Sequence, residues 1–106
     1  MSHAHLPKLY QRLNEQYPEF METLNKLGEL VQQQGPLGAK ELHLIQMAAA
    51  VAVHSEGSVH SHTRRALAAG ATPEEIRHAV LALTSTVGFP TMAAAMSWVE
   101  DVIAKQ

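Results

Sequence analysis

The 106-residue sequence contains no cysteine. This absence excludes disulfide bonds, thiolate metal ligands and thiol-based redox catalysis. Aromatic residues are also scarce, at 5%, although 46% of the residues are hydrophobic, so Ala, Leu, Val and Met supply most of the apolar volume. Such a composition favours helices over sheets.

Neither sign of charge dominates, because eight Lys and Arg face ten Asp and Glu. No basic stretch could neutralise a row of phosphates, so we expect no nucleic-acid partner. The longest apolar run, Met47 to Val53, is far shorter than the ~20 residues of a membrane span, and we expect no membrane contact. The N-terminal segment MSHAHLPK lacks a charged region followed by an apolar one, so we expect no signal peptide and a cytoplasmic protein.

Helical periodicity begins near the N-terminus and continues to a Gly- and Pro-rich connector. Two amphipathic helices are predicted within residues 6–33, the first with an apolar face from Leu6, and Pro18 either ends the first or opens the second. The connector QQQGPLG, residues 32–38, is predicted to be a loop. The next segment, residues 39–53, is apolar almost all round, which predicts the central helix of the fold.

Three further helices are predicted after the central one. Gly57 is expected to break the helical pattern, so that the next helix starts near Ser58 and ends at Gly70 in a left-handed cap. Thr72 and Glu75 then form a capping box for a helix that continues to residue 87. The GFP sequence at 88–90 separates it from a last helix, whose apolar stripe consists of Met92, Met96, Val99 and Ile103. About six helices and no convincing strand indicate an all-α bundle that forms a single domain over residues 1–106.

Residues 37–103 resemble the core of the carboxymuconolactone decarboxylase and AhpD-like family. The resemblance rests on LGAKELHLIQMAAAVAV, on HTRRALAAGATPEEIRHAVLAL with its H-x-R-x-A-x-x-x-G-x-T-x-E-E-I pattern, and on GFPTMAAAMSWVEDV. It implies an AhpD-like or carboxymuconolactone decarboxylase-like helical bundle, with this core preceded by the helices of residues 6–33. It also implies a homo-oligomer, a trimer or a hexamer. A short chain with so apolar a central helix independently favours self-association.

The family resemblance points to two chemistries, and the residues here match only one of them. In the AhpD-like branch a Cys-x-x-Cys pair would occupy Ser55 and Ser58, and a glutamate would occupy His43, with His62 matching the family histidine. Without thiolates, no peroxiredoxin or alkylhydroperoxidase activity is expected. The decarboxylase branch also lacks the cysteines, and it implies cofactor-free acid–base chemistry on a small carboxylated, lactone-like substrate.

His62 and His43 are the candidate catalytic imidazoles. His62 lies three residues after Val59 and four before Ala66, so it shares their inward stripe, either as a catalytic group or as a hydrogen-bonded core residue. His43 is either a surface residue of the central helix or the partner of His62. A simple hairpin turning at residues 55–57 leaves His43 ~18 Å and His62 ~9 Å from the turn, so a kinked helix or a second subunit would have to bring them together.

Polar residues near His62 complete the candidate site. Ser58 is a candidate catalytic hydroxyl, while Ser55, His60 and Arg64 are assigned to substrate binding, because a helix N-terminus and a nearby guanidinium can hold a carboxylate. The alternative interpretation makes one serine an N-cap and leaves Arg64 on a solvated face.

No cofactor and no metal are expected, because the strong zinc-binding spacings are absent. A weaker alternative is a metal held across the turn by His54, His60 and His62. Two classes of function therefore stay open. One is an acid–base enzyme, decarboxylase- or lyase-like; the other is a non-catalytic, oligomeric family member that binds a small ligand or a metal.

Overall fold

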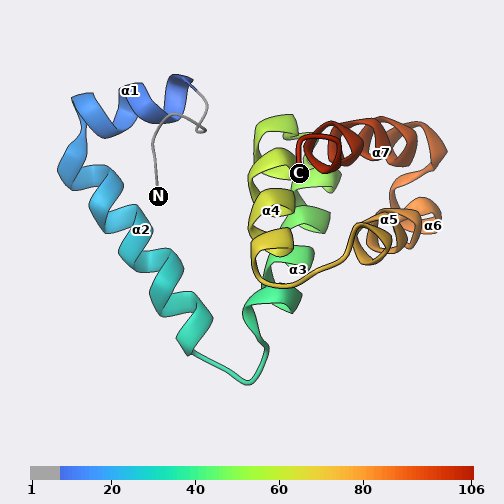
Figure 1. Ribbon diagram of the computed structural model, residues 1–106, viewed down its shortest axis with the longest axis horizontal. Coiled ribbons are helices and arrows are strands. Elements are labelled where there is room, and N and C mark those ends of the chain that lie inside the picture. Colours follow the sequence, from blue (N-terminus) through green and yellow to red (C-terminus); the bar gives the residue numbers. More distant parts are fainter. Residues whose placement is uncertain (1–7) are drawn as a thin grey trace. The chain divides into compact units, whose positions relative to one another are not determined.

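The structure is a computed structural model that describes residues 8–106, so Leu6 of the first predicted stripe lies outside the described residues. Over this range the chain forms helices and no strand, which confirms the all-α prediction (Figure 1). The helices are α1 (Lys8–Gln16), α2 (Pro18–Gln33), α3 (Ala39–Ala52), α4 (Glu56–Ala68), α5 (Pro73–Leu81), the single turn α6 (Thr84–Val87) and α7 (Phe89–Ile103). Among the described helices, none combines the length and apolarity needed to cross a bilayer.

The chain divides between Pro36 and Leu37 into two compact units. In the first unit α1 packs against α2, and the Tyr10 hydroxyl donates a hydrogen bond to Asn25 Oδ1 at 3.3 Å. Pro18 opens α2, where its missing N–H costs no helical hydrogen bond. The second unit contains α3 to α7 and holds the main hydrophobic core.

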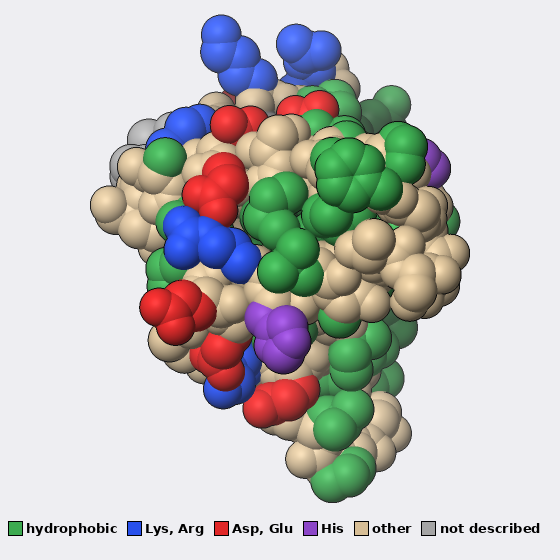
Figure 2. Space-filling view, turned by 90° about the vertical axis from the view of Figure 1, so that its right-hand side faces the viewer, with side chains coloured by type: hydrophobic (Ala, Val, Ile, Leu, Met, Phe, Trp, Pro, Cys, Tyr) green, Lys and Arg blue, Asp and Glu red, His purple; other side chains and the backbone are tan. Residues whose placement is uncertain are grey.

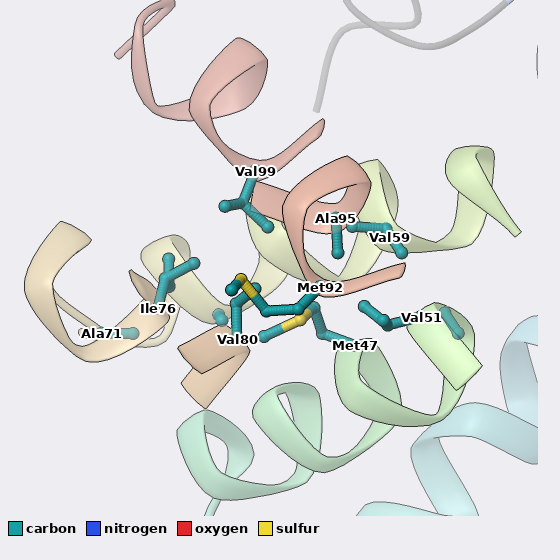
Figure 3. Packing of buried hydrophobic residues seen from close by; sticks show 11 residues of the cluster. Met47, Val51, Val59, Ala71, Ile76, Val80, Met92, Ala95 and Val99 are labelled. Carbon is teal, nitrogen blue, oxygen red and sulfur yellow. The ribbon is translucent and has the colours of Figure 1, made fainter. Parts of the chain in front are cut away.

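The core of the second unit forms where α3, α4, α5 and α7 meet (Figure 3). Helices α3 and α4 pack against each other most extensively, and α7 packs on α4 and α5. Four helices contribute fully buried side chains, namely Met47, Val51, Val59, Ala66, Ile76, Val80, Ala95 and Val99. The aliphatic composition of the sequence thus provides a core made almost without aromatic rings.

Two helices end in the same hydrogen-bonded motif, one with glycine and one with histidine. At the end of α4, Gly70 has φ of 102°, and the Ala71 N–H donates to the Ala66 carbonyl at 2.9 Å. At the end of α3, His54 takes the equivalent place with φ of 59°, and the Ser55 N–H donates to the Ala50 carbonyl at 2.9 Å. Both are Schellman terminations, in which a left-handed residue lets the chain reverse.

Two predicted helix boundaries were wrong. Helix α4 starts at Glu56 rather than near Ser58, so Gly57 lies inside its first turn and does not break it. Helix α5 ends at Leu81, before the predicted residue 87. A tighter turn follows, in which the Leu83 N–H donates to the Val80 carbonyl at 3.0 Å and the Thr84 hydroxyl donates to the Leu81 carbonyl at 2.7 Å. The capping box of α5 is confirmed, with both hydrogen bonds between Thr72 and Glu75 present.

Candidate active site

The structure brings His43 of α3 and His62 of α4 into direct contact. Their Nδ1 atoms are 3.3 Å apart, and the ring centroids are 5.5 Å apart with an interplanar angle of 30°. His43 is only 7% exposed, one turn before the fully buried Met47, whereas His62 is half-buried. The expected offset between them is therefore wrong, because α3 and α4 of one chain bring the two rings together without a second subunit.

This contact restricts the protonation of the two rings. A neutral imidazole carries its proton on one nitrogen only, and a hydrogen bond between two Nδ1 atoms needs one donor and one acceptor. Two Nδ1–H groups, or two lone pairs, would repel each other at 3.3 Å. When both rings are neutral, they must therefore be opposite tautomers, so that one Nε2 carries a proton and the other carries a lone pair.

Burial and a neighbouring cation keep the pair neutral. Desolvation lowers the pKa of His62 to about 4, with further lowering from Arg65 and then His43. Desolvation also lowers the pKa of His43, as does Arg65, against a hydrogen bond with the Gln46 side chain that raises it. Arg65 is thus the positive charge that acts on both imidazoles. At pH 7 the pair is uncharged and able to accept a proton.

The remaining candidates from the sequence are spread along α4. Ser58 is exposed one turn before His62, and Ser55 occupies the N-cap position of α4 without a hydrogen bond from its side chain to the helix. Of the residues assigned to substrate binding, namely Ser55, His60 and Arg64, Arg64 is two residues from His62 and so points to another side of the helix. Arg65, three residues from His62, shares its side. The i, i+3 spacing to His62 distinguishes Arg65 from its neighbour Arg64.

The structure does not bring together the three histidines of the alternative metal site. His54 is exposed at the end of α3, His62 faces α3, and His60 lies against α7. Over residues 8–106, the group whose ligand atoms do converge consists of Glu56, His60 and Asp101, all within 4.8 Å of one another. Sequence spacing indicates the i, i+4 pair Glu56 and His60, but no local signal identifies Asp101 of α7.

The fold and the site define an all-helical protein, over the described residues, with a cysteine-free pair of imidazoles in contact between two of its helices. The profile of the carboxymuconolactone decarboxylase family matches residues 18–101, and the chain belongs to that family. It is similar to the crystal structure of the apo form of a carboxymuconolactone decarboxylase family protein from Legionella pneumophila. The two are 25% identical, the match covers 91% of this chain and 86% of that chain, and the TM-score is 0.76. No curated protein matches the chain. Because the sequence contains no cysteine, the thiol peroxidase chemistry of the AhpD-like branch is excluded.

Proposed function

We propose that this protein is a cofactor-free acid–base enzyme that acts on a small carboxylated, lactone-like substrate, with His62 as the group that exchanges the proton. The observation that carries the proposal is the 3.3 Å contact between the Nδ1 atoms of His43 and His62. A general base needs a defined tautomer and a held orientation, and a second ring nitrogen bonded to Nδ1 supplies both. In this proposal His62 is catalytic and His43 is a positioning residue.

The Gln46 side chain extends the proposed hydrogen-bond chain beyond His43. It forms a hydrogen bond with His43 that raises the pKa of the imidazole, and an amide oxygen that accepts from the ring N–H would have this effect. In the arrangement that we propose, His43 donates from Nε2 to the Gln46 amide oxygen and accepts at Nδ1 from the Nδ1–H of His62. The Nε2 of His62 then carries the lone pair. It accepts a proton from the substrate, and the resulting imidazolium keeps its Nδ1–H bond to His43.

Arg65 suits this site to an anionic substrate. A substrate carboxylate near its guanidinium would offset the positive charge that lowers the pKa values of both imidazoles. The pKa of His62 would then rise from about 4 toward neutrality, where a general base is most effective. By linkage, binding of the carboxylate is accompanied by proton uptake, so its affinity rises as the pH falls from 7 to 5.

Self-association is part of the same proposal. Helix α2 exposes an apolar stripe at helical spacing, formed by Phe20, Leu24, Leu27 and Val31. On the face shown in Figure 2, hydrophobic side chains also gather beside interspersed acidic and basic ones. Such surfaces favour association of chains, and we propose a trimer or a hexamer. A monomer in light scattering at micromolar concentration would contradict this state without affecting the assignment of His62.

Solvent hydrogen exchange tests the chemistry without requiring the physiological substrate. A panel of butenolide and butyrolactone carboxylates is incubated with the protein in D2O, and loss of the C–H signals next to the carbonyl is followed by proton NMR. The wild-type protein should accelerate exchange in at least one compound, and His62→Asn should reduce that acceleration by about 100-fold or more, the usual contribution of a general base. The exposed His78 provides the matched control variant His78→Asn, which should exchange at the wild-type rate.

Measuring ligand binding alongside hydrogen exchange distinguishes an enzyme from a non-catalytic ligand-binding protein. Thermal stabilisation by the same carboxylates reports binding by mass action. Stabilisation together with His62-dependent exchange supports the enzyme. Stabilisation without exchange would identify a ligand-binding protein instead. Equal exchange by wild type and His62→Asn would refute the role of His62.

A further inference from the structure

A second cluster of ionisable side chains lies apart from the His43 and His62 pair, at the contact between α4 and α7. Glu56 and His60 are one turn apart on α4, and Asp101 comes from α7. His60 Nε2 lies 3.7 Å from a carboxylate oxygen of Glu56 and 3.9 Å from one of Asp101. Three potential ligand atoms from two helices thus converge on one point.

The nitrogen at the centre of this cluster has no hydrogen-bond partner. His60 Nε2 is buried although the side chain as a whole is 26% exposed, and both carboxylates are too distant for a hydrogen bond. Buried polar atoms are almost always hydrogen-bonded, so a nitrogen that has only two long ion-pair contacts with carboxylates needs an explanation. A divalent cation would satisfy the nitrogen and offset both negative charges at once.

The donor set and its geometry fit a first-row transition metal. Imidazole nitrogen and carboxylate oxygen both bind Zn²⁺ at about 2.0–2.2 Å, and a tetrahedral site keeps ligand atoms about 3.3 Å apart. The separations of 3.7 and 3.9 Å from His60 Nε2 must therefore close by about half an ångström, and that between the two carboxylates, which is within 4.8 Å, by up to about 1.5 Å. Both carboxylate side chains are more than half exposed, at 55% and 63%, so they can rotate inward.

We propose that Glu56, His60 and Asp101 bind a divalent transition-metal ion, with Zn²⁺ as the probe, and that the ion fastens α4 to α7. The site leaves the fourth position of a tetrahedral ion to water. It is distinct from the imidazole pair, because His60 and His62 are two residues apart on α4 and so point to different sides of the helix. The proposal does not depend on the acid–base activity.

Calorimetric titration of Zn²⁺ into the full, chelator-treated chain tests the site. His3 and His5 are replaced by alanine in every protein, so that these imidazoles cannot supply ligands. The background protein should bind one Zn²⁺ per chain, and His60→Ala and the isosteric Asp101→Asn and Glu56→Gln should each weaken binding at least tenfold. His78→Ala and Glu29→Gln remove an exposed imidazole and an exposed carboxylate elsewhere, and they should leave the affinity within twofold.

Three outcomes would overturn the proposal. They are an absence of Zn²⁺ binding, binding that is unchanged by Asp101→Asn, and binding that is lost in His62→Ala but retained in His60→Ala. Circular dichroism of each variant checks that the helices are intact, and Asp101→Asn keeps the shape of an exposed side chain, so its effect on binding does not come from misfolding. Addition of Co²⁺ gives a second readout, because its visible absorption reports nitrogen and oxygen coordination and should disappear in His60→Ala.

Discussion

Acid should destabilise this protein through His62, and the size of the effect follows from its environment. The pKa falls from 6.5 to about 4 on folding, mainly because burial disfavours the charged ring. Between these pH values the unfolded chain binds the proton more tightly than the folded one, so stability is complete above pH 6.5 and decreases as the pH falls toward 4. A shift of this size corresponds to roughly 3 kcal/mol without screening, and solvent screening of a half-buried ring reduces it to about 1–2 kcal/mol.

The assay compares urea unfolding of wild type and His62→Gln at pH 7.5 and pH 4.5, followed by fluorescence of Trp98, which packs against the core. Between pH 7.5 and pH 4.5 the free energy of unfolding should fall by about 1–2 kcal/mol more in the wild-type protein than in the variant. Two carboxyl groups also have lowered pKa values, Glu75 mainly through Thr72 and Glu100 mainly through Arg77. Their effect on the pH dependence of stability is the same in both proteins and cancels in the difference. An identical pH dependence in both proteins would refute the claim that His62 is held neutral.

Three further substitutions test the packing and the helix ends. Met47→Ala should cost about 2–5 kcal/mol in urea unfolding, because the side chain is fully buried and leaves a cavity; a loss below about 1 kcal/mol would contradict the packing. Thr72→Ala removes the cap of α5 and should lower the stability by about 1 kcal/mol in thermal unfolding. Thr72→Ser keeps the capping hydroxyl and should retain most of that stability. His54→Gly should stabilise the protein by about 0.5–1 kcal/mol, since glycine adopts its left-handed conformation without strain, and a lower melting temperature would argue against that conformation.

Features that depend on neighbours in the sequence could be predicted. The capping box of Thr72 and Glu75 and the left-handed cap at Gly70 are both local, and both are present. The start of α4 was missed because the reversal before it depends on a positive φ at His54, and residues other than glycine adopt positive φ only uncommonly. Gly57 then looked like a break, although it lies in the first turn of α4.

The same boundary explains why the contact between the imidazoles was not expected. With α3 ending at Ala52 and α4 starting at Glu56, His43 lies ~14 Å and His62 ~9 Å along their helices from the reversal. The difference of ~5 Å between these two rises is one helical turn, and two long side chains can span it. The placement of Asp101 beside His60 could not be derived in this way, because it depends on where α7 crosses α4.

The neutral imidazole at position 43 leaves the positive charge of Arg65 without a nearby carboxylate at that position. A carboxylate there, as the family resemblance would place it, would hold His62 as part of an ion pair and repel other anions. His43 is uncharged at pH 7, and Arg65 is the ionised group that acts on both rings. In the proposed function, the positive charge of Arg65 attracts a carboxylate substrate before any contact is made. Capture of a carboxylate should accordingly slow as ionic strength rises, because salt screens that attraction.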